Sequence, residues 1–178
     1  LSLHDALPIY QMGLNQLKQL HPQMDSILKQ IGHTAGSVGD RMKALAKDPK
    51  YKFSDGYQGR GEIMAFIQDR LKWINAQLPR AFNTLVHPNM EVKRMSPEEE
   101  PGAPTAYGGA GSIDGKIPGR FWINLRSTDL HRKYSLADLA FHESIPGHIW
   151  QGEYTHKDPL IRQLLAFDKD AAGLLASD

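Results

Sequence analysis

The sequence has no cysteine among its 178 residues. This excludes a disulfide framework, a thiol nucleophile and a thiolate metal site, so a protein-bound metal ion would need His, Asp or Glu ligands. An excess of charge of one sign is also lacking, because 21 Lys and Arg residues stand against 20 Asp and Glu residues. Nor does any apolar run approach the roughly 18 residues of a membrane span. We therefore expect neither a nucleic-acid partner nor a transmembrane segment.

The length allows one domain of ordinary size. The first nine residues, Leu1–Ile9, read LSLHDALPI, which a widely used short-read sequencing adapter encodes codon by codon. We expect this segment to be an adapter-derived leader that is not native. Residues 10–178 would then be a partial single domain, and any signal peptide of the parent protein would be lost from the open reading frame.

Apolar periodicity predicts a mainly α fold with a small β-sheet just before the last helices. A glycine-rich segment, 107–119, is predicted to be a loop. The strand at 121–125 either offers an edge to an extended peptide or packs Phe121 and Ile123 into a core, and the two-residue period favours the core. The predicted helices are 10–31, a Ser37-capped helix ending at Ala46, 62–82, and a helix from a capping box at Ser135–Asp138, and the predicted strands are 90–95 and 121–125.

The last predicted helix carries His142 and Glu143, followed by His148. This order is similar to the zinc-peptidase H-E-x-x-H signature with the second histidine displaced by two residues. On a straight helix, residues i and i+6 are about 120° apart, so the two imidazoles could not share one zinc ion. Pro146 and Gly147 lie between them and favour a break that brings His148 back over His142. The alternative is an ordinary helix stop flanked by two unrelated histidines.

The segment His142–His148, followed by Gln151, resembles the HExxPGHxxQ signature of the bacterial domain-of-unknown-function 885 family. The segments 13–28, 111–125 and 134–148 are also similar to that family. The resemblance implies a mainly helical, zinc-metallopeptidase-like protein, often secreted, periplasmic or lipoprotein-anchored. It further implies that His142 and His148 are zinc ligands and that Glu143 is the general base that takes a proton from a zinc-activated water.

The third metal ligand departs from the family pattern. The family places a Glu within an E-G-W segment, and this Glu position falls on Ala172 here, with Leu174 at the Trp position. The third ligand is therefore unknown, and two protein ligands alone would bind zinc weakly. Other carboxylates and histidines nearby are poorly placed to replace this ligand. On a helix that resumes at His148, Glu153 would point about 140° away from it and His156 would lie about 12 Å along the axis. Asp168 and Asp170 could bind the ion only if their segment were rearranged.

The function that we favour is a zinc-dependent hydrolase that cleaves peptide bonds, with the present chain itself inactive. One alternative is a non-catalytic helical binding or scaffold member that lost the third ligand. Another is a metallohydrolase acting on an ester or a non-peptide amide. The substrate-binding residues and the oligomeric state are unknown. We expect Glu98–Glu100 to be a solvated charge run and Arg126, His131 and Arg132 to be surface residues, although these three could also bind a substrate carboxylate.

Overall fold

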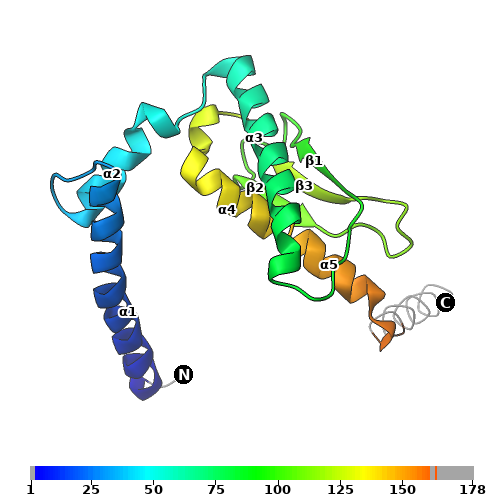
Figure 1. Ribbon diagram of the computed structural model, residues 1–178, viewed down its shortest axis with the longest axis horizontal. Helices are drawn as coiled ribbons and strands as arrows, with labels where there is room; N and C mark the ends of the chain where they lie inside the picture. The colour runs from blue at the N-terminus through cyan, green and yellow to red at the C-terminus, as the bar shows by residue number, and fades with distance from the viewer. Residues whose placement is uncertain (1–2, 161–162, 164–178) are drawn as a thin grey trace. The chain divides into compact units, whose positions relative to one another are not determined.

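The computed structural model describes residues 3–160 and residue 163 (Figure 1). The chain divides into two compact units, the first ending at Tyr51 and the second beginning at Lys52. The described residues are mainly helical and contain one three-stranded sheet, so the predicted fold class is confirmed. In this part of the chain, every helix is too short or too polar to cross a membrane.

The first unit contains two helices and a short 3-10 turn. Helix α1 spans Leu3–Gln30, α2 spans Val38–Lys47, and the turn η1 spans Pro49–Tyr51. The predicted end of the first helix is confirmed. Gly32 has a φ of +96°, a backbone angle that residues with a Cβ rarely adopt.

The predicted capping of α2 is also confirmed. The Ser37 hydroxyl accepts the Asp40 N–H at 3.2 Å, and the Asp40 carboxylate accepts the Ser37 N–H at 3.1 Å. These reciprocal bonds satisfy backbone donors that the first helical turn leaves free. Arg41, the residue after Asp40 in α2, forms an ion pair of 2.6 Å with Asp25 of α1. The two helices of this unit are therefore connected by charge as well as by their buried apolar residues.

The second unit packs helices against one face of the sheet. The strand order is β1-β3-β2, with β1 parallel and β2 antiparallel to the central strand. Its elements are α3 (Gly56–Gln77), η2 (Leu78–Arg80), β1 (Met90–Arg94), β2 (Ala106–Gly109), β3 (Gly119–Ile123), η3 (Thr128–Leu130), α4 (Lys133–Glu143) and α5 (His148–Lys157).

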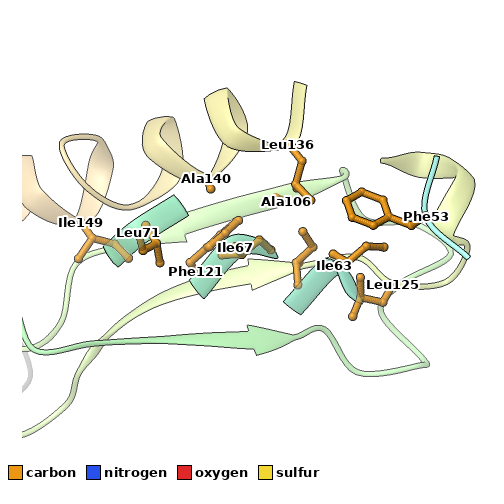
Figure 2. Close-up of a cluster of buried hydrophobic side chains, with 11 residues drawn as sticks. Phe53, Ile63, Ile67, Leu71, Ala106, Phe121, Leu125, Leu136, Ala140 and Ile149 are labelled. Atoms are coloured by element: carbon orange, nitrogen blue, oxygen red, sulfur yellow. The ribbon is translucent and has the colours of Figure 1, made fainter. Parts of the chain in front are cut away.

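The main core of this unit lies between the inner face of the sheet and the helices α3, α4 and α5 (Figure 2). Phe121 and Ile123 of β3 are completely buried, so the core alternative for this strand is confirmed. Because β3 is flanked by β1 and β2, it has no edge for an added peptide strand. The core side chains are Phe53, Ile63, Ile67, Leu71, Ala106, Phe121, Ile123, Leu125, Leu136, Ala140 and Ile149.

In the second unit, two helix starts differ from the sequence prediction. Helix α3 begins at Gly56 rather than near Glu62, because Glu62 accepts both the N–H and the hydroxyl of Ser54 and so fixes the chain ahead of the helix. Helix α4 begins at Lys133 rather than at a capping box on Ser135. The Ser135 hydroxyl instead donates to the Arg132 carbonyl oxygen at 3.3 Å, from inside the first turn.

The glycine-rich segment contains a strand that periodicity did not reveal. Residues Ala106–Gly109 form β2, where the prediction was a loop. A Cβ built on Gly108 would lie 2.0 Å from the backbone carbonyl oxygen of Glu143. The absence of a side chain therefore lets β2 approach the end of α4 directly, and this contact places the sheet beside the predicted metal helix.

Candidate metal centre

A break in the helix separates the two histidines of the motif, as the sequence predicted. Helix α4 ends at Glu143 and α5 begins at His148. The backbone N–H of Trp150 donates to the Ser144 carbonyl oxygen at 3.0 Å, so a backbone hydrogen bond connects the two sides of the break. A Cβ on Gly147 would lie 1.8 Å from the His142 carbonyl oxygen. Only glycine fits at this close approach of the two chain segments.

The break brings the two imidazoles together. The ring centroids of His142 and His148 are 4.8 Å apart, and the ring planes meet at 80°. Both side chains are exposed to solvent. They open into one pocket of about 450 Å³, which is lined by His142, Pro146, Gly147, His148, Trp150, Gln151 and Tyr154. The predicted metal ligands therefore share a solvent-accessible site.

Glu143 has a different environment from its neighbour His142. It is the last residue of α4 and its exposed fraction is 8%. The described residues that line the pocket do not include it. Its backbone carbonyl is fixed against Gly108 of β2. The role of Glu143 as a general base stays a prediction.

A small second core supports the break and the start of α5. It joins Ile145, which lies between the histidines, and Trp150 of α5 to Leu78 and Val86. The indole N–H of Trp150 donates to the Val86 carbonyl oxygen at 3.1 Å. The position of His148 thus depends on residues that follow α3 as well as on its own helix.

The described residues leave the third ligand open. Among them, no group of three or more His, Asp or Glu side chains is placed to hold a metal ion. The Glu153 carboxylate forms an ion pair with Lys157 at 3.3 Å, and both residues lie on α5. Asp168, Asp170 and Ala172 lie outside the described residues.

The three residues that were predicted to lie at the surface, Arg126, His131 and Arg132, differ in their exposure to solvent. His131 is only 2% exposed, and its Nε2 lies 2.7 Å from the Asn124 carbonyl oxygen. Burial lowers the pKa of His131, and the bond to Asn124 opposes this effect. A surface position for His131 was therefore wrong. Arg126 is exposed as predicted, and it donates to the Pro101 carbonyl oxygen at 3.3 Å.

The run of three glutamates is solvated only in part. Glu100 is 3% exposed and forms two hydrogen bonds with the Arg94 guanidinium, at 2.7 and 2.8 Å. It also accepts the Leu125 N–H at 2.9 Å. A solvated position was wrong for this residue, because its carboxylate closes the loop before β2 onto the end of β3. Glu98 and Glu99 are exposed.

A family model described as "Bacterial protein of unknown function (DUF885)" matches residues 4–172. The chain belongs to this family. The predicted resemblance to this family is thereby confirmed, while the family description assigns no activity. No curated protein matches this DUF885 chain.

Among solved structures, the DUF885 chain is similar to the crystal structure of a candidate lipoprotein from Colwellia psychrerythraea. The TM-score is 0.80 and the sequence identity is 34%. The alignment covers 85% of this chain and 26% of the Colwellia chain. The present sequence therefore spans about a quarter of the length of that protein.

Sequence reasoning identified the histidine pair but missed the aromatic support of the pocket. Trp150 and Tyr154 are four residues apart on α5, and their ring centroids are 4.6 Å apart. This i, i+4 spacing was a readable signal that both rings share one face of the helix. Gln151, the last position of the family signature, lines the same pocket.

Proposed function

We propose that this DUF885 chain provides two histidine ligands and a general base to a zinc-dependent hydrolase, with a peptide or small amide as substrate. The observation that carries the proposal is the pairing of His142 and His148, which are six residues apart in sequence and 4.8 Å apart by ring centroid. An unrelated helix stop gives no reason for the two rings to meet in one open pocket.

The donor set fits zinc as far as the described residues extend. Neutral imidazole is a common zinc ligand, and both imidazoles are exposed to solvent, so an ion can reach them. The described residues supply no third protein ligand. We expect this chain by itself to bind zinc more weakly than a site with three or four protein ligands.

The proposed chemistry is hydrolysis of an amide bond. A bound zinc ion would supply Lewis acidity, which lowers the pKa of a coordinated water. Glu143 follows the first ligand directly, and we propose that its carboxylate accepts the proton of the attacking water and returns it to the leaving amine. The pocket beside the histidines, with Gln151 and Tyr154 in its wall, is where we place the substrate.

Two further aspects follow as proposals. The description of the Colwellia protein as a candidate lipoprotein supports a secreted, periplasmic or lipoprotein-anchored location for the full-length protein. The same metal chemistry would also serve an ester or a non-peptide amide.

A non-catalytic binding or scaffold protein is the competing function. It is favoured by one observation, which is Ala172 at the position of the family's third ligand. Such a protein would keep the fold and the histidine pair without stoichiometric zinc. Zinc binding therefore separates the two functions before any substrate is known.

Calorimetric zinc titration of the 178-residue chain tests the proposal. We expect one equivalent to bind, and we expect His142→Ala and His148→Ala each to abolish it. His156→Ala is the matched control, since His156 also lies on α5 but about 12 Å along the axis from His148. Zinc binding that survives both ligand substitutions, or no binding at all, would contradict the proposed metal site.

A further inference from the structure

Two aromatic side chains attach α5 to the segment that follows α3. The indole N–H of Trp150 donates to the Val86 carbonyl oxygen at 3.1 Å, and the Tyr154 hydroxyl donates to the Thr84 carbonyl oxygen. Phe82 packs edge to face on Trp150, with ring centroids 4.6 Å apart. Figure 1 shows the chain after α3 passing beside α5. The helix that begins with His148 is thus bonded to a distant part of the unit.

The contacts of Trp150 lie in the first turn of α5, next to the break. Trp150 is two residues after His148, and its exposed fraction is 6%. Ile145, on the other side of His148 in sequence, is buried in the same small core. The backbone around His148 is therefore anchored on both sides to Leu78 and Val86.

The hydrogen bond of Trp150 is the directional part of this anchoring. Apolar contacts fix the depth of a side chain, whereas an indole N–H bonded to a carbonyl also fixes rotation of the ring and of the helix that carries it. Because the bond is buried, its loss leaves the Val86 carbonyl without this partner, at a cost in free energy. A rotation of α5 would change the direction of the His148 imidazole relative to His142.

We propose that Trp150 is a positioning residue for His148, acting through its hydrogen bond to the Val86 carbonyl, with Tyr154 and Thr84 as a second point of attachment. The inference rests on the proposed zinc site for its effect on metal binding. Its structural part, the fixed orientation of the two imidazoles, is independent of zinc. Partners outside the ligand set that orient metal-binding histidines typically change metal affinity by about 10- to 100-fold when they are removed.

The test is Trp150→Phe, which keeps an aromatic ring in the small core and removes the N–H. In the metal-free chain, we measure the nuclear Overhauser effect between the ring protons of His142 and His148. In the same samples, we titrate zinc and follow both imidazoles by NMR. We expect the variant to show a weaker cross-peak and about tenfold weaker zinc binding, with an unchanged far-ultraviolet circular dichroism spectrum.

Two further variants keep the test decisive. Tyr154→Phe removes the second attachment and is expected to change both readouts in the same direction, so it serves if Trp150→Phe does not fold. Trp122→Phe is the matched control, because Trp122 lies on the outer face of the sheet, where it contacts Tyr107 and Arg120. We expect this control to leave both readouts unchanged.

The outcomes separate this inference from the proposed function. An unchanged cross-peak and unchanged zinc affinity in Trp150→Phe and Tyr154→Phe would overturn the positioning role. If the unmodified chain binds no zinc, the proposed function fails, and the cross-peak alone decides whether Trp150 orients His148. Equal effects in Trp122→Phe would show a general loss of stability and would also overturn the inference.

Discussion

The imidazole of His142 lies edge to face against that of His148, with centroids 4.8 Å apart, although a continuous helix would direct the two rings to different sides. The intervening break makes this possible, and the break depends on the closeness of Gly147 to the His142 carbonyl oxygen. The geometry of the proposed metal site is therefore a property of the backbone between its ligands as much as of the ligands themselves.

Gly147→Ala is expected to disturb the histidine pair. The added Cβ would lie 1.8 Å from the His142 carbonyl oxygen, so the two segments must separate. We expect a loss of about 1–3 kcal/mol in the free energy of unfolding, as for other overpacked sites, and a loss of zinc binding. Urea unfolding and zinc titration measure the two effects.

Gly61→Ala is the control for this substitution. Gly61 lies in α3, and a Cβ there would meet nothing within 4 Å. Alanine is the better helix former, so this variant is expected to gain up to about 1 kcal/mol. If Gly147→Ala were as stable as Gly61→Ala and bound zinc normally, the break would not require glycine.

Gly108→Ala tests the contact between the sheet and the metal helix. The new Cβ would lie 2.0 Å from the Glu143 carbonyl oxygen, so β2 or the end of α4 must shift. We expect a loss of about 1–3 kcal/mol in the free energy of unfolding. Gly109→Ala, at the next residue of the same strand, meets nothing within 4 Å and is expected to be nearly neutral. Similar unfolding curves for the two variants would contradict a close packing of β2 on α4.

The sequence predicted those features whose causes are local. The end of α1 at Gly32 and the capping of α2 by Ser37 and Asp40 depend on a few neighbouring residues. The break at Pro146–Gly147 is of the same kind, because proline lacks the N–H that a continuing helix needs. These local rules were sufficient to place the two histidines together.

The features that were missed depend on distant partners. Trp150 bonds to the Val86 carbonyl, 64 residues earlier, and no periodicity records such a pair. His131 is buried with its ring bonded to the Asn124 backbone, although the two residues that follow it, Arg132 and Lys133, are charged. The strand β2 exists because β3 provides a partner for a glycine-rich segment with little strand propensity of its own.

Glu100 is expected to give the stability of the chain an acid-sensitive component. The Arg94 guanidinium, supported by the Leu125 N–H, holds the pKa of Glu100 below its ordinary value of 4.5, against the opposing effect of burial. The carboxylate therefore contributes stability in full above pH 4.5, and this contribution is lost as the pH falls through the lower pKa of the folded state.

Glu100→Gln isolates this component. At pH 7 we expect a loss of about 1–3 kcal/mol, because Arg94 and the Leu125 N–H lose a charged acceptor. The difference from the unmodified chain should shrink as the pH falls below 4.5. Glu98→Gln, at an exposed position of the same loop, serves as the control and should follow the unmodified chain. A constant difference from pH 7 to pH 3 would contradict an ionised Glu100 in the folded protein.

Glu143→Gln separates metal binding from catalysis. Glutamine keeps the size of the side chain but cannot accept a proton, so zinc should still bind while turnover falls by about 10²-fold or more. The assay uses the full-length gene product that contains these residues, with a peptide or amide substrate that it cleaves, and zinc content is measured on the same sample. His142→Ala in parallel should lose both zinc and turnover, because it removes a proposed ligand. Full turnover in Glu143→Gln would show that another group takes the proton, and equal loss of zinc in both variants would make Glu143 a residue that supports the metal site rather than the general base.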